Sequence, residues 1–141
     1  MPQQERSNSE AMGLSQLSEE HELIRERYAE LEEAIFHGHG SERIMESSAL
    51  LVELLLNHCI HEARFMAKIA PFSEERLVTI RRRLMQLSIL KKELKQGEIY
   101  AALHLRSFCK QWVNEHLHME EVEFGPALAQ NGEMLISAQP E

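Results

Sequence analysis

Apolar residues recur along most of this chain at steps of three, four and seven, which places them on one face of a helix. In the first such stripe, Leu17, Ile24 and Leu31 are joined by His21 and Tyr28 at the same spacing. Similar stripes recur in three later segments of the chain. The pattern predicts four helices, at about residues 15 or 18 to 37, 41 to 70, 73 to 97 and 98 to 125.

Helix-breaking residues separate the predicted helices. Gly38 and Gly40 follow the first stripe, and Pro71 follows the second. Long amphipathic helices with short connections favour an antiparallel up-down four-helix bundle. No alternating pattern predicts a β-strand, so we expect an all-α fold.

Length and composition are those of one small domain. The chain has 141 residues, 43% of them hydrophobic, which is enough to bury a single core. We expect the bundle at residues 14–130, between a disordered segment at 1–13 and a tail at 131–141. The formal net charge of −8 argues against a nucleic-acid partner, because a nucleic-acid binder needs a basic face.

The sequence also indicates a cellular location. The polar start of the chain has no signal-like apolar region, and no apolar run is long enough to cross a membrane. The two cysteines, Cys59 and Cys109, are then expected to be reduced thiols that fill the core. We therefore expect a cytoplasmic protein with no membrane partner.

Two polar residues continue an apolar stripe in the second predicted helix. Its series of Ile44, Leu51 and Leu55 runs on through His58 and Glu62. The last two are four residues apart, so their side chains reach the same point on one helix face. A carboxylate on a core face is costly unless it is paired, protonated or bound to a cation.

Two further histidines lie on or beside inner stripes, His21 in the first helix and His116 in the last. Imidazole and carboxylate groups that converge from different helices of a bundle suit a first-row metal ion. Four residues after His116, Glu120 lies about 40° around an ideal helix, whereas Glu121 lies about 140° around it. Glu120 is the simpler partner, and Glu121 requires a local widening such as a π-bulge. A buried His–Glu hydrogen-bond network without metal is the alternative.

These motifs resemble those of the hemerythrin family, most closely the bacterial hemerythrins and the wider HHE cation-binding group. The resemblance covers roughly residues 14–128 and rests on EEHELIRERYAELE around His21, LLNHCIHEARFM around His58, and WVNEHLHMEEVEF around His116. The last stretch matches a pattern of Trp-x3-His with a carboxylate five residues later. That carboxylate is Glu121 here.

The resemblance implies two non-heme irons that bind oxygen between them. By position, His21 and His58 would ligate one metal ion, Glu62 and Glu121 would bridge, and His116 would ligate the second. The family thus favours Glu121 over Glu120. Zinc or manganese would also suit two histidines and carboxylates.

The third predicted helix departs from the family, which places a His-x3-His pair there. The matching stretch, SEERLVTIRRRL, contains no histidine. Depending on the alignment, the two places fall on Glu75 and Thr79, Arg76 and Ile80, or Leu77 and Arg81. Three arrangements follow. The side with His21 and His58 holds a single metal ion, completed by Glu62 and Glu121, with or without His116. Alternatively, Glu75 supplies a ligand to a two-metal site, or the site is lost and Arg81 turns inward as a counter-ion for the carboxylates.

We expect a metal-binding protein, with iron as the metal, that binds or senses dioxygen or a small oxidant at a site with fewer ligands than usual. The alternative is an interaction or structural module of hemerythrin fold whose metal site has been lost. A binding protein is favoured over an enzyme, because di-iron oxidases carry two Glu-x2-His motifs and this chain has one, Glu115 to His118. His61 and His118 lie off the inner stripe and are expected at the surface or beside the ligands.

Overall fold

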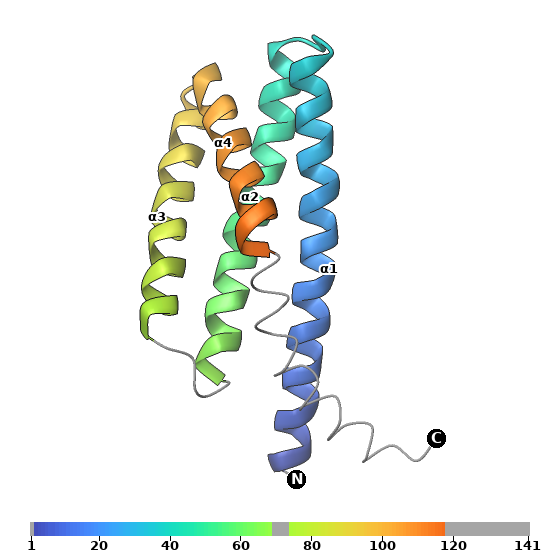
Figure 1. Ribbon diagram of the computed structural model, residues 1–141, viewed down its shortest axis with the longest axis vertical. Coiled ribbons are helices and arrows are strands. Elements are labelled where there is room, and N and C mark those ends of the chain that lie inside the picture. The colour runs from blue at the N-terminus through green and yellow to red at the C-terminus, as the bar shows by residue number, and fades with distance from the viewer. Residues whose placement is uncertain (1, 69–73, 118–141) are drawn as a thin grey trace, which may run out of the picture.

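The computed structural model describes residues 2–68 and 74–117, with side chains at 15–68 and 74–114. This part of the chain is all-helical and contains no strand, which confirms the predicted class. Its elements are α1 (Pro2–Phe36), α2 (Ser41–Lys68), α3 (Glu74–Lys95), α4 (Ile99–Gln111) and the π-helix η1 (Trp112–Leu117). Consecutive helices reverse direction, and α1 and α2 lie side by side as a long hairpin (Figure 1).

The helix ends at Phe36, Lys68 and Lys95 lie within a few residues of the predicted ends, and the predicted end of the fourth helix near residue 125 lies outside the described residues. α1 begins at Pro2, well before the predicted start at Ser15 or Ser18. Its end at Phe36 is followed by Gly40, whose φ of +90° is a conformation that residues with a Cβ atom rarely adopt. Gly97, with a φ of +80°, has the same role between α3 and α4.

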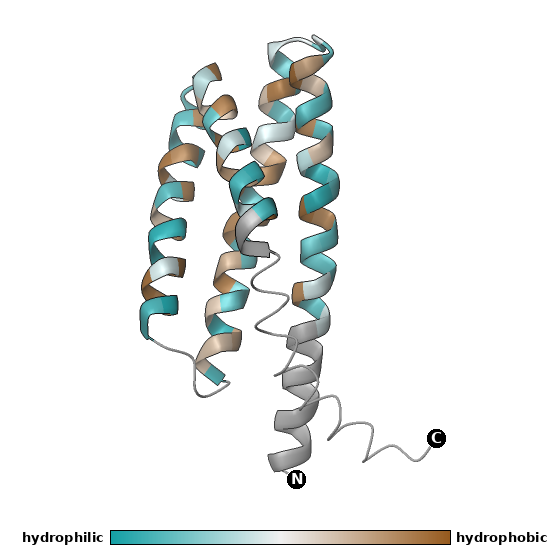
Figure 2. Ribbon diagram, viewed as in Figure 1, coloured by the Kyte–Doolittle hydropathy of each residue, from teal (hydrophilic) through white to brown (hydrophobic). Residues whose placement is uncertain are grey.

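The core is built from the stripes that the sequence predicts. On α2, the apolar residues Leu51, Leu55 and Phe65 are buried, and His58 and Glu62 are buried among them. In Figure 2, hydrophilic and hydrophobic residues are interspersed along α2, α3, α4 and the coloured part of α1, as expected when each helix buries one face only. The core residues on the other helices include Leu17, Ile24, Leu31, Ile80, Leu87, Leu94, Ala102, Leu105, Cys109 and Trp112. Within the described residues, no helix is long and apolar enough to cross a membrane.

Candidate metal centre

Three of the predicted site residues meet between α1 and α2. His21 comes from α1, and His58 and Glu62 come from successive turns of α2. The Nε2 atoms of the two histidines are 3.2 Å apart, and Nε2 of His58 is 3.4 Å from Oε2 of Glu62. The exposed fractions are 6% for His21, 0% for His58 and 1% for Glu62, so the three groups are withdrawn from bulk water. We call these three residues the polar cluster.

A second carboxylate, Glu20, contacts His58 at the ring nitrogen that faces away from His21 and Glu62. Its two oxygens contact Nδ1 of His58 at 3.1 Å and Nδ1 of His61 at 2.5 Å. Burial alone raises the pKa of Glu20, but the hydrogen bonds from His58 and His61 outweigh it and hold the pKa below its ordinary value. Glu20 is therefore ionised at neutral pH and acts only as an acceptor. Both imidazoles donate to it from Nδ1.

The contact with Glu20 fixes which atom of His58 faces the cluster. A neutral imidazole that donates from Nδ1 carries its lone pair on Nε2. That lone pair faces His21 on one side and the carboxylate of Glu62 on the other. A histidine held from behind by a carboxylate is the usual arrangement of a metal-binding imidazole.

Trp112 forms one wall of the polar cluster. Its ring lies edge-on to His58, with ring centroids 5.3 Å apart, and edge-on to His21 at 5.9 Å. The side chain is 2% exposed. Trp112 is also the first residue of the π-helix, so the residue that packs against the cluster belongs to the widened part of the chain.

The π-helix is the local widening that the sequence requires if Glu121 is to share a face with His116. It covers Trp112–Leu117 and so includes His116. The His116 side chain is not among those described, and His118, Glu120 and Glu121 lie outside the described residues. The choice between Glu120 and Glu121, and the ligand role of His116, therefore stay predictions.

Helix α3 does not supply the replacement groups that the sequence suggested. Glu75 and Arg81 are both exposed, so Glu75 is not placed as a ligand and Arg81 is not turned inward. The buried arginine of this helix is Arg83, which is 8% exposed. Ile80 is buried and Arg76 is half-buried. Of the three alternative pairs of positions, Arg76 and Ile80 are therefore the pair that faces the core.

The spacing of the donor atoms can be compared with what a metal ion needs. Two atoms bound to one ion at about 2.1 Å, with an angle of about 90–110° between them, lie about 3.0–3.4 Å apart. The contacts from His58 to His21 and to Glu62 fall in this range. Even so, in residues 15–68 and 74–114 no three His, Cys, Asp or Glu side chains are grouped so that they could hold a metal ion.

Cys59 and Cys109 are buried and form no disulfide in the described part of the chain, as expected for core-filling residues. Burial raises the pKa of Cys109 to about 12, and the charge of Glu32 adds to the effect. The thiol of Cys109 therefore stays protonated at neutral pH in the metal-free protein.

Comparison of the chain with protein-family models, curated proteins and solved structures finds no match.

Proposed function

We propose that this protein binds a non-heme metal ion, with iron as the metal, in a cytoplasmic up-down bundle of the hemerythrin kind. One observation carries the proposal. Nδ1 of His58 is engaged by Glu20, and Nε2 of His58 lies 3.2 Å from Nε2 of His21 and 3.4 Å from Oε2 of Glu62. A buried carboxylate beside two imidazoles is a place where a cation, either a metal ion or a proton, is stabilised.

The residues of the chain have distinct parts in this proposal. His21, His58 and Glu62 bind the ion, and Glu20 orients His58 through Nδ1. His116 and Glu121 would complete the ligand set from the fourth helix, as the resemblance implies. Small side-chain rotations are needed, because the close contacts of the cluster run through His58 rather than to one central point.

The absence of histidine from α3 favours a site with few protein ligands. When bound, an iron ion with an incomplete protein ligand set supplies an open position for dioxygen or a small oxidant. Such a site suits binding or sensing more than turnover.

A second candidate is an interaction or structural module in which the cation is a proton. The lack of a metal-holding group in the described part of the chain favours it, as does the arginine buried on α3. The polar cluster would then be a hydrogen-bond network within the core.

Elemental analysis of freshly purified protein, with aerobic and anaerobic absorption spectra of the same sample, separates the two candidates. We expect about one iron per chain and none of the strong absorption of an oxo-bridged two-iron centre. Protein without bound metal would favour the second candidate. A strong band of that kind would show that two irons are held despite the sequence of α3.

Replacing Glu20 tests how the chain positions His58. We expect Glu20→Gln to weaken binding of cobalt(II), used as a spectroscopic probe, by about 10–100-fold, because carboxylate partners of metal-binding histidines contribute this much. The spectrum at saturation should match the wild type, since the ligands are the same. The matched control is Glu19→Gln, at the exposed neighbouring carboxylate. Equal losses in both variants would contradict the role of Glu20.

A further inference from the structure

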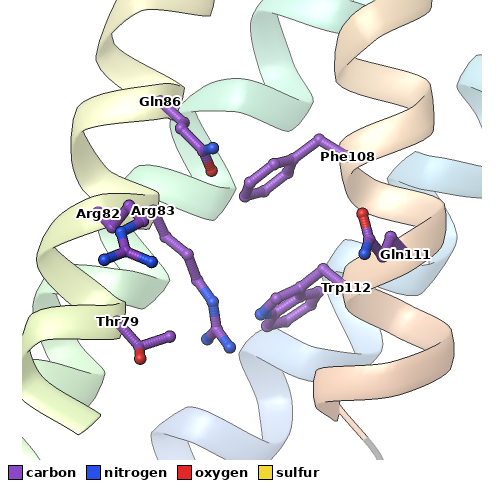
Figure 3. Close-up of a pocket in the computed structure, with 7 residues that line it drawn as sticks. All are labelled: Thr79, Arg82, Arg83, Gln86, Phe108, Gln111 and Trp112. Carbon is purple, nitrogen blue, oxygen red and sulfur yellow. The ribbon is translucent and has the colours of Figure 1, made fainter. Parts of the chain in front are cut away.

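A cleft of about 390 Å³ lies between α3 and α4. Helix α3 contributes Arg82, Arg83 and Gln86, and the opposite side carries Phe108 and Gln111, with Trp112 beyond them (Figure 3). Among the described residues, no Asp or Glu side chain lines it. The cleft is thus rich in hydrogen-bond donors and positive charge in a chain whose net charge is −8.

The donors come from both sides of the cleft. The guanidinium groups of Arg82 and Arg83 carry positive charge, and the amides of Gln86 and Gln111 add donors without a charge of their own. Guanidinium groups bind carboxylate and phosphate oxygens in a bidentate geometry that an ammonium group cannot reproduce. A site of this composition selects an oxyanion over a neutral or cationic group.

Trp112 provides an independent indication of a ligand. Its side chain is 98% buried, and in the described part of the chain its indole Nε1–H meets no hydrogen-bond acceptor. A buried donor without an acceptor is costly, so such groups call for an explanation. Figure 3 shows the nitrogen edge of the ring turned toward the side chain of Arg83. An oxygen atom placed between these two side chains would accept hydrogen bonds from both.

Size and aromatic content define the rest of the ligand. The rings of Phe108 and Trp112 form an apolar wall opposite the arginines (Figure 3). The volume of about 390 Å³ is within the range of small-molecule sites, and an inorganic ion would fill only a fraction of it. The ligand therefore needs an apolar, preferably aromatic, body as well as a charged head.

We propose that this cleft binds a small organic anion, whose carboxylate or phosphate group is held by Arg82, Arg83 and the indole N–H of Trp112. Phe108 and the Trp112 ring hold its aromatic body. None of the three residues of the polar cluster lines the cleft, although Trp112 lines the cleft and also packs against His21 and His58, and the inference does not depend on a bound metal ion.

The chain provides its own probe for this site, because Trp112 is its single tryptophan. We expect benzoate or phenyl phosphate to change the fluorescence of chelator-treated protein in a saturable way, with calorimetry giving one site per chain. The two probes show whether carboxylate or phosphate is preferred. Benzamide, which has the same ring without the charge, should bind at least about tenfold more weakly. Equal binding of benzamide, or no saturable binding of either anion, would overturn the proposal.

Three adjacent arginines supply matched variants. Arg82→Gln and Arg83→Gln should each weaken binding of the preferred anion by about tenfold or more, because each removes a charge-assisted hydrogen bond. Arg81→Gln removes the same charge from an exposed residue that does not line the cleft, and should leave the affinity unchanged. Arg82 is also exposed, so Arg82→Gln tests the site even where loss of the buried Arg83 unfolds the protein. Equal effects of Arg81→Gln and Arg82→Gln would show that only the overall charge matters.

Discussion

His58→Ala is expected to lower the iron content of the purified protein at least about tenfold, since loss of a ligand should cost no less than loss of a partner behind it. His58 is fully buried and contacts His21, Glu62 and Glu20. Its removal takes away the proposed ligand atom that lies between His21 and Glu62. Elemental analysis and a cobalt(II) titration measure the effect.

The control for this experiment lies three residues further along the same helix. His61 also donates to Glu20, but it lies outside the polar cluster and is partly exposed. His61→Ala should therefore retain the iron. His58→Gln keeps more of the side-chain volume, so it separates loss of a ligand from a cavity in the core. If His58→Ala and His61→Ala lose the same amount of iron, the assignment of inner and outer histidines on α2 is wrong.

Leu51→Ala is expected to destabilise the metal-free protein by about 2–5 kcal/mol, the usual cost of emptying a well-packed leucine site. Leu51 is completely buried, one heptad before His58 on the same face of α2. Urea unfolding of the chelator-treated protein, followed by circular dichroism, measures the change in the free energy of unfolding.

The neighbouring residue is the matched control. Leu50 is 54% exposed, so Leu50→Ala should change the free energy of unfolding by no more than about 0.5 kcal/mol. The pair tests the rotation of α2 about its axis. If Leu50→Ala were the more damaging change, His58 and Glu62 would also face away from the core.

The sequence was sufficient to predict the inner face of α2. The steps from Leu51 to Leu55, His58 and Glu62 are three or four residues long, and all four residues are buried. Periodicity succeeds here because a long helix with one strong apolar stripe can bury that stripe in only one way. The burial of Glu62 could therefore be expected from the sequence alone.

Glu20 and Arg83 show where such reasoning fails. Glu20 precedes His21 and lies beside the stripe, where only the packing of α1 against α2 decides that it reaches His58 and His61. On α3, Leu84 continues the spacing of Ile80 and Leu87 at steps of four and three, yet the structure buries Arg83 and leaves Leu84 only half-buried. Positions 83 and 84 lie on either side of the line along which α3 faces the core. A small rotation of α3, which no periodicity specifies, selects between them.

The order of assembly follows from the place of the polar cluster in the chain. Glu20, His21, His58 and Glu62 all belong to the α1–α2 hairpin, and the contacts between its two arms join residues 37 to 41 positions apart. A single turn at Gly38 to Gly40 brings the arms together, so closing one loop is enough to form the polar cluster and its contact with Glu20. The hairpin can therefore form these contacts before α3 and α4 pack against it. Substitutions on α3 can then accumulate over evolution without dismantling the contacts made within the hairpin.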